Sequence, residues 1–177
     1  MKNTDNTNTV LPILIATNSF LRKKTRIVQP EDISEIRKVV PTMFETMYQA
    51  SGIGLAAPQV GIGLRFFIVD LMKDDVSDPM VFINPEIFEK SDEQSGYREG
   101  CLSFPEQFAD VIRSEKIKVK YMDLEGKINE IEADGLLARC IQHETDHLDG
   151  ILFVDHLSSL KKNIIMRKII KEQKREH

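Results

Sequence analysis

Several features are scarce or missing in this chain of 177 residues, and each absence argues against a class of protein. Two cysteines, Cys101 and Cys140, are too few for a disulfide scaffold and favour a reduced, cytoplasmic protein. The longest apolar runs, such as residues 10–16, fall far short of the roughly 20 residues that a membrane span needs. The net charge of −4 gives no sign of nucleic-acid binding. We therefore expect neither a membrane nor DNA among the partners.

The start of the chain also lacks the features of a secretion signal. MKNTDNTNTV contains one lysine and no long apolar stretch, so we expect residues 1–9 to be solvated and disordered. Hydrophobic residues make up 41% of the chain and charged residues 29%, as in ordinary globular proteins. Since there is no internal repeat and no linker, residues 1–177 are expected to form a single domain.

The spacing of apolar residues predicts both helices and strands. Residues 31–50 have helical spacing, and Pro41 is expected to kink or split that helix. Further helices are predicted at 135–148, with Gly150 as a stop signal, and at 158–175. Strands are predicted at 65–71, 80–84, 107–114, 116–123 and 127–134. The last two resemble an antiparallel hairpin.

The stretch QHETDHLDG, residues 142–150, contains two histidines at helical spacing. Because residues four apart lie on one face of a helix, His143 and His147 can bind one metal ion. Glu144 is turned about 100° from His143, beside the ligand face, where a carboxylate can accept a proton from a metal-activated water. A solvated polar helix face accounts for the same letters, and the motif alone does not decide between the two.

A third metal ligand has two possible sources. Zinc endopeptidases of the metzincin type take a histidine six residues after the second, but that position is Phe153, and His156 comes too late. Upstream, Cys101 lies in EGCLSFP, a loop shaped by glycine and proline at a strand end. A thiolate with two imidazoles suits a borderline divalent ion and leaves a position for water. Cys140 is expected instead to be a small buried hydrophobic residue on the apolar side of the helix.

Residues 52–61, GIGLAAPQVG, form the most unusual stretch of the sequence. Three glycines and two alanines leave the backbone bare, so that a peptide can approach it, and Gln59 offers an amide donor. A phosphate-binding loop is disfavoured because no Gly-Lys-Ser/Thr follows. Tight packing of a helix against a strand explains the small residues equally well.

The three stretches, in this order, resemble the peptide deformylase family of bacteria and organelles. That family has a GIGLAAPQV loop, an EGCLS loop and a QHExDH helix, and the similarity extends from about Val10 to the last helix. The resemblance implies an α+β fold, with antiparallel strands packed around a central metal-binding helix and with helices near both ends. It implies removal of the N-formyl group from the formyl-methionine of newly synthesised proteins, which releases formate.

The resemblance also implies roles for particular residues. The metal ligands are Cys101, His143 and His147, with Fe(2+) expected and Zn(2+), Ni(2+) or Co(2+) as substitutes. Glu144 is the acid/base, and Gln59 and the backbone N–H of Leu102 are the oxyanion donors. The peptide is expected along Gly54, and Glu99 is expected to hold the cysteine loop by pairing with Arg113. The methionine side chain is expected near Ile53, Tyr97, Leu136, Cys140 and the ring of His143.

Three features leave the partners and preferences open. Phe108 and Arg139 depart from the residues that relatives often carry, which affects the expected peptide preference but not the chemistry. The segment from Leu160 to His177 has a net charge of +5, so the other 159 residues carry −9. We expect its apolar stripe, Leu160, Ile164, Ile165 and Ile169, to dock on the core. A basic end on an acidic body suggests a polyanionic partner, and the family resemblance suggests the ribosome near the nascent-chain exit. An ordinary amphipathic surface helix is the alternative.

Overall fold

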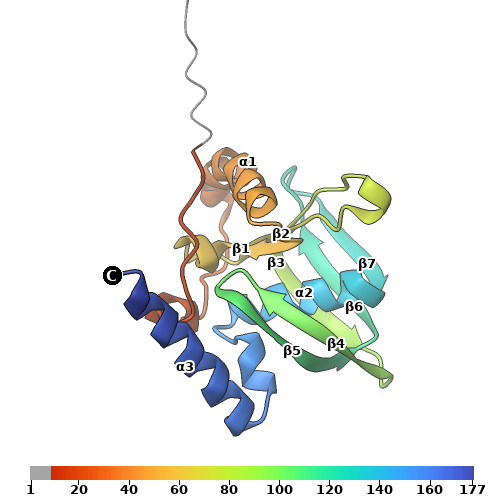
Figure 1. Ribbon diagram of the computed structural model, residues 1–177. Coiled ribbons are helices and arrows are strands. Elements are labelled where there is room, and N and C mark those ends of the chain that lie inside the picture. Colours follow the sequence, from red (N-terminus) through yellow and green to blue (C-terminus); the bar gives the residue numbers. More distant parts are fainter. Residues whose placement is uncertain (1–8) are drawn as a thin grey trace, which may run out of the picture.

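The structure is a computed structural model that describes residues 9–177, and it arranges them as two β-sheets and three α-helices (Figure 1). The predicted disordered start therefore lies, apart from residue 9, outside the described residues. Within residues 9–177, no helix is long and apolar enough to cross a membrane. Short 3₁₀ helices connect the larger elements at Ser19–Arg22, Pro30–Asp32, Ala57–Val60, Lys73–Asp75 and Phe153–His156.

The larger sheet has five antiparallel strands in the order β1-β2-β3-β6-β7. Their bounds are β1 Gly54–Ala56, β2 Phe66–Val69, β3 Met80–Lys90, β6 Lys116–Met122 and β7 Ile128–Asp134. The predicted hairpin between the last two is confirmed, with Val119 opposite Ile131. The short strand β1 lies at the edge of the sheet, so one side of its backbone has no neighbouring strand within the described chain.

Helices cover both faces of this sheet, which explains why β2 is entirely apolar. Phe66 and Ile68 pack in the cluster that includes α1 (Ile33–Gln49), whereas Phe67 and Val69 pack in the cluster that includes α2 (Gly135–Leu148). The expected split at Pro41 does not occur, and α1 is one helix across it. Proline removes only one backbone hydrogen bond there, while the apolar face of α1 stays packed on the sheet.

The second sheet is a hairpin of β4 (Gln94–Cys101) and β5 (Phe104–Ser114), joined by Leu102 and Ser103. It lies across α2 from the larger sheet, so the helix is held between the two sheets (Figure 1). The sequence predicts β5 only in part and does not predict β4. The glycines and charged residues of β4 have low β-propensity, so its sequence does not indicate a strand. Cys101 is the last residue of β4, which confirms its expected place at a strand end.

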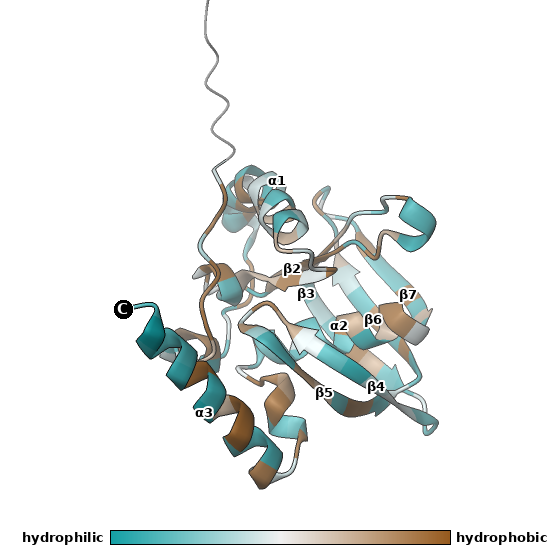
Figure 2. Cartoon of the chain, in the orientation of Figure 1, coloured by the Kyte–Doolittle hydropathy of each residue, from teal (hydrophilic) through white to brown (hydrophobic). Residues whose placement is uncertain are grey.

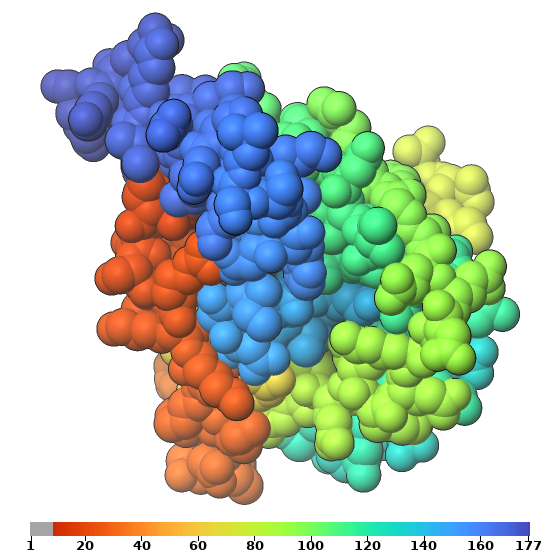
Figure 3. All heavy atoms as spheres, turned by 90° about the horizontal axis from the view of Figure 1, so that it is seen from below, coloured from red at the N-terminus to blue at the C-terminus, as the bar shows by residue number. Residues whose placement is uncertain are grey.

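The last helix, α3 (Ser159–Arg175), packs through Ile165 and Ile169, which are buried. The expected four-residue stripe is wrong in part, because Leu160 is 71% exposed and Ile164 is 44% exposed. At about 100° per residue, both lie off the face that Ile165 and Ile169 share. Figure 2 shows the helix as mostly hydrophilic with hydrophobic bands, and in Figure 3 its C-terminal end projects from the body.

Candidate functional site

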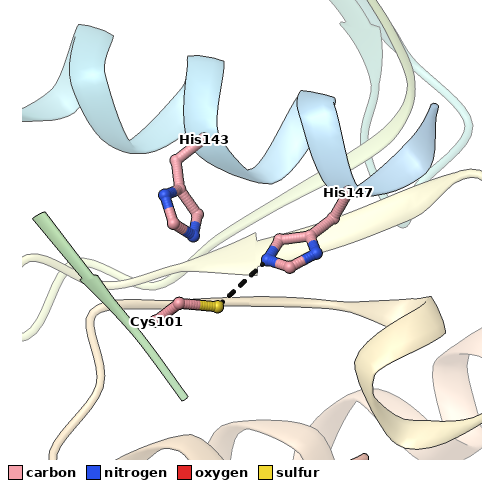
Figure 4. Close-up of side chains that lie close together, drawn as sticks. All are labelled: Cys101, His143 and His147. Carbon is pink, nitrogen blue, oxygen red and sulfur yellow. Dashed lines mark hydrogen bonds between the residues drawn. The ribbon is translucent and has the colours of Figure 1, made fainter. Parts of the chain in front are cut away.

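Three side chains that could hold a metal ion come from two different elements and converge beside α2 (Figure 4). Cys101 comes from the end of β4, and His143 and His147 come from successive turns of α2. Their donor atoms all lie within 4.8 Å of one another, and the Cys101 Sγ is 3.3 Å from the Nε2 of His147. Among residues 9–177 this is the one group of three such donors. The structure therefore brings together the three ligands that the sequence suggests.

The geometry and the charges of this group fit a divalent metal ion. Bonds of about 2.0–2.3 Å in a tetrahedral site would place two donors roughly 3.3–3.6 Å apart. The Cys101 Sγ and the His147 Nε2, at 3.3 Å, lie at the lower end of that range. Burial lowers the pKa of His147 well below its usual value, which leaves a neutral imidazole able to donate a lone pair. Although burial opposes it, Cys101 and Glu99 raise the pKa of His143 well above its usual value, so the acidic groups around this ring favour positive charge at its position. The residues present fit the ion.

Glu99 fixes the orientation of His143. Its Oε1 lies 3.0 Å from the Nδ1 of His143, which leaves Nε2 to face the other donors. The guanidinium of Arg113 donates to both oxygens of the same carboxylate, at 2.7 and 3.0 Å, and reaches Asp146 on α2 at 2.9 Å. Burial opposes ionisation, but His143 and Arg113 hold the pKa of Glu99 at about 2. A carboxylate that fixes the tautomer and the ring of a ligand is a common support of metal sites.

Glu144 is a buried carboxylate that is not one of the three donors. Its Oε2 has no hydrogen-bond partner within the described part of the chain. Burial raises the pKa of its carboxyl to about 7. A group that must accept a proton and then release it near neutral pH works best with such a pKa. Its neighbours on α2, Gln142 and His143, are buried as well, so the alternative of a solvated polar face is wrong.

Two neutral donors lie next to the sulfur of Cys101. The side-chain oxygen of Gln59 accepts from the N–H of Ala56 at 2.9 Å, so the amide NH₂ must point the other way. That NH₂ lies 3.6 Å from the Cys101 Sγ and 3.1 Å from the Ser103 Oγ. Leu102 follows Cys101 directly, in the two-residue connection between β4 and β5. The hydrogen bond that closes such a tight turn joins its first and last residues, so it does not use the backbone N–H of Leu102.

A cavity of about 750 Å³ opens onto this group. Its lining includes the five residues expected around the methionine side chain, namely Ile53, Tyr97, Leu136, Cys140 and His143. Gly54 lies on the edge strand β1 and faces the same cavity. A Cβ added there would lie 2.6 Å from the Glu144 Oε1 and 2.9 Å from the Cys140 Sγ. The bare backbone at this point therefore lets β1 approach the helix closely.

The two cysteines have different surroundings, as the sequence suggests. Cys140 is buried in the apolar cluster under α2, with its Sγ 3.9 Å from the carbonyl oxygen of Ile53. Burial raises the pKa of this thiol well above its usual value, so it stays protonated. His156 and Phe153, the two residues that the metzincin pattern brings into question, supply no further donor, although the Phe153 ring stacks against His143 with the ring centroids 6.3 Å apart. The first pairs with Asp146 at 2.8 Å and the second belongs to the core.

Sequence reasoning missed part of the network around Glu99. Arg139 donates to Glu99 at 2.7 Å, although the sequence suggests only an effect on peptide preference. Asp146, within the histidine motif, accepts from both Arg113 and His156, and Ser103 accepts from Gln59. The position of Asp146, directly before His147, could have indicated its role, because it places the carboxylate on the side of α2 that faces the hairpin and Arg113. Nothing in the sequence signals the partner of Arg139.

Comparisons with known proteins place these features in one family. The family model described as Polypeptide deformylase matches residues 10–163. A peptide deformylase of Rhodopseudomonas palustris is 49% identical over 166 residues, covering 92% of this chain and 94% of the relative. One of Mesorhizobium japonicum is 47% identical over 163 residues, covering 92% of both chains. The crystal structure of a Legionella pneumophila peptide deformylase has a TM-score of 0.87 at 41% identity, covering 95% of this chain and 98% of its own. The Ehrlichia chaffeensis enzyme in complex with actinonin has a TM-score of 0.88 at 38% identity, covering 93% and 98%.

Proposed function

This chain belongs to the peptide deformylase family, and from that premise we propose how its residues remove the N-formyl group from formyl-methionyl peptides. The reaction adds water across the formyl C–N bond and yields formate and a free amino terminus. One observation supports the assignment of roles most strongly. The three metal donors, the Glu144 carboxyl and the Gln59 amide all meet at or beside one cavity that borders an edge strand.

Cys101, His143 and His147 would hold the metal ion of this metal-dependent family. When bound, the ion supplies a Lewis acid that activates water near neutral pH. Fe(2+) is our proposal for the native ion, because one thiolate and two imidazoles suit borderline and soft divalent metals. Zn(2+), Ni(2+) and Co(2+) fit the same donors. Protein loaded with Fe(2+) should lose formate release on aeration while protein loaded with Ni(2+) keeps it, and an air-stable iron form would contradict this choice.

Glu144 carries the proton between water and the leaving amine. Its unpartnered Oε2 accepts the proton from water and returns it to the nitrogen of the breaking C–N bond. A carboxyl with a pKa of about 7 gains and loses a proton readily at neutral pH. As the formyl oxygen becomes negative, it is met by the amide of Gln59 and the N–H of Leu102. Removing one such donor typically costs about 10²–10³ in rate.

The peptide is held by backbone and by apolar contacts. An extended substrate can pair with the free edge of β1 at Gly54, as an added strand does. The methionine side chain then enters the part of the cavity between Ile53, Tyr97, Leu136 and Cys140. Phe108 and Arg98 lie further along the same lining, with the guanidinium 5.3 Å from the ring centroid. That pair faces the residues that follow methionine.

The direct test is release of formate from formyl-Met-Ala-Ser by the purified protein. Acetyl-Met-Ala-Ser is the matched control, because it has the same peptide and differs only at the acyl group. We expect formate from the first peptide and no cleavage of any internal peptide bond in either. Internal cleavage would support the zinc endopeptidase alternative. Metal binding without turnover of any peptide would support a non-enzymatic metal site, although no fourth side chain joins the three donors among residues 9–177.

The C-terminal helix supports a proposal about location in the cell. Lys171, Lys174 and Arg175 are exposed near the projecting end of α3 (Figure 3), and Leu160 and Ile164 add exposed apolar surface to the same helix. We propose that α3 docks on the ribosome near the nascent-chain exit, which also implies a cytoplasmic enzyme. Clustered cations on an otherwise acidic body favour ribosomal RNA as part of that surface.

Charge reversal tests the ribosome proposal without touching the cavity. Changing Lys171, Lys174 and Arg175 to Glu should weaken co-sedimentation with ribosomes at low salt and spare turnover of a short formyl peptide. The control reverses three exposed lysines elsewhere, Lys73, Lys116 and Lys127. Equal binding by the wild type and the α3 variant, or equal loss in both variants, would exclude docking through α3.

A further inference from the structure

Arg139 is a buried arginine with an unusually complete set of partners. It lies on α2, one turn before His143, and its side chain is 8% exposed. One guanidinium nitrogen donates to the Glu99 Oε2 at 2.7 Å and to the carbonyl oxygen of Val111 at 3.0 Å. The other donates to the carbonyl oxygen of Ser95 at 2.8 Å and to its hydroxyl at 3.3 Å. A buried charge of this kind is tolerated only when such bonds compensate for lost hydration.

These bonds tie the helix to both strands of the hairpin. Ser95 and Glu99 belong to β4 and Val111 belongs to β5, whereas Arg139 belongs to α2. The same two bodies carry the metal donors, since α2 supplies both histidines and β4 supplies Cys101. The position of the hairpin against the helix therefore sets the distance between sulfur and imidazole. Arg139 is one of the side chains that fix that position.

Arg139 also completes the restraint on Glu99. The Oε1 of Glu99 accepts a hydrogen bond from Arg113 and pairs with the Nδ1 of His143. The Oε2 accepts hydrogen bonds from Arg113 and Arg139. Without Arg139, the Oε2 keeps a single bond, to the Nε of Arg113. The carboxylate then gains freedom to turn, and the ring of His143 turns with its partner.

The same guanidinium supports a wall of the cavity. Its central carbon lies 5.3 Å from the centroid of the Tyr97 ring, within the range of a cation–π contact. Tyr97 is 51% exposed and lines the cavity, so little else restrains its ring from the solvent side. Arg139 itself lines the cavity next to this ring.

We infer that Arg139 is a positioning residue that links the methionine pocket to the metal donors. It holds the Tyr97 wall on one side and the Glu99–His143 pair on the other. This inference rests on the proposed function for the identity of the pocket, but its effect on the metal donors does not. Loss of Arg139 should therefore weaken metal retention and selectivity for methionine together.

The test compares Arg139→Met, which keeps the length of the stem, with Arg139→Lys, which keeps the charge but not the fork. Metal affinity is measured by competition with a chelator, and the visible absorption bands of Co(2+)-loaded protein report the donor geometry. Loss of an outer partner of a metal ligand typically costs about 10–100-fold in affinity, and we expect about 10-fold for Arg139→Met. Its Co(2+) bands should shift. Arg139→Lys should recover part of the affinity, because one ammonium can still reach Glu99.

Selectivity is the second readout. The ratio of kcat/KM for formyl-Met-Ala-Ser to that for formyl-Ala-Ala-Ser should fall in both variants, since neither keeps a planar group behind Tyr97. Arg37→Met is the matched control, because Arg37 also donates twice to a backbone carbonyl, that of Leu124, but lies on α1 away from the cavity. It should leave metal affinity, Co(2+) bands and selectivity unchanged.

One result would overturn the inference, namely an Arg139→Met protein with wild-type metal affinity, Co(2+) bands and selectivity. If that protein also melts earlier than the wild type, Arg139 has a purely structural role. Failure of the proposed function looks different, because the wild type itself would then release no formate while the Co(2+) comparison could still be made.

Discussion

A methyl group added at Gly54 tests the closest contact between the edge strand and the proposed acid/base. Gly54 does not adopt a left-handed backbone conformation, so alanine there meets no backbone strain. The new Cβ would lie 2.6 Å from the Glu144 Oε1 and 2.9 Å from the Cys140 Sγ. Any loss of stability in Gly54→Ala therefore comes from these two side chains.

The distances set the expected size of the effect. Ordinary contact begins at 3.4 Å, so the Glu144 oxygen must move by 0.8 Å from its 2.6 Å position. Overpacking a core usually costs about 1–3 kcal/mol, and we expect about 1 kcal/mol because the end of the Glu144 side chain can turn away. Turning it away displaces the proton carrier, and a shift of about 1 Å in a reacting group typically costs about 10²-fold in rate.

Urea unfolding and formate release on the same preparations measure the two effects. Gly96→Ala is the control, because a Cβ there has no heavy atom within 4 Å, and this strand glycine also lacks a left-handed conformation. We expect Gly54→Ala to unfold slightly earlier and to lose about 100-fold in kcat, while Gly96→Ala keeps both. A Gly54→Ala enzyme with wild-type kcat would refute the placement of Glu144 beside β1.

Three further predictions concern the site and the core. Glu144→Gln should retain metal but lose about 10²–10⁴-fold in turnover, and near-full activity would mean that another group carries the proton. Cys101→Ala should lose metal in a chelator competition, while Cys140→Ala should cost only packing, about 1 kcal/mol in urea unfolding; equal metal loss from both would show that both thiols bind. Asp70 accepts from Tyr48 and from three other donors, which hold its pKa at about 2 against the opposing effect of burial. Asp70→Asn should therefore lose about 1–2 kcal/mol of stability at pH 7, and the difference should fade below pH 4 and vanish as the pH passes through about 2; a pH-independent difference would contradict this.

The spacing of apolar residues along the sequence predicted those helices and strands whose residues follow a regular period. The helix that carries His143 and His147 and the hairpin of β6 and β7 follow from periods of about four and two residues. The strand β4 could not be predicted, because its place in a sheet depends on pairing with β5 and not on its own residues. The docking face of α3 was misjudged for a similar reason. Which apolar residues of a helix are buried depends on the surface that it meets, and Leu160 meets none.

The candidate site shows the same division. The motifs indicated the candidate metal donors, Glu144 and Gln59, because those groups occur in fixed local patterns. The shared use of Glu99 by Arg113, Arg139 and His143 joins three elements, and only the tertiary structure brings them together. Burial, which raises the pKa of Glu144 to about 7, is likewise a property of the folded chain.

The most direct test of the account measures metal content and formate release on one sample. Metal is removed stepwise with a chelator from the wild type and then restored, and formyl-Met-Ala-Ser turnover is followed at each step. We predict that the rate rises in proportion to bound metal and levels off at a single ion per chain, and that Cys101→Ala neither holds the ion nor turns over. Full turnover by metal-free protein, or a Cys101→Ala protein that behaves like the wild type, would contradict the central claim.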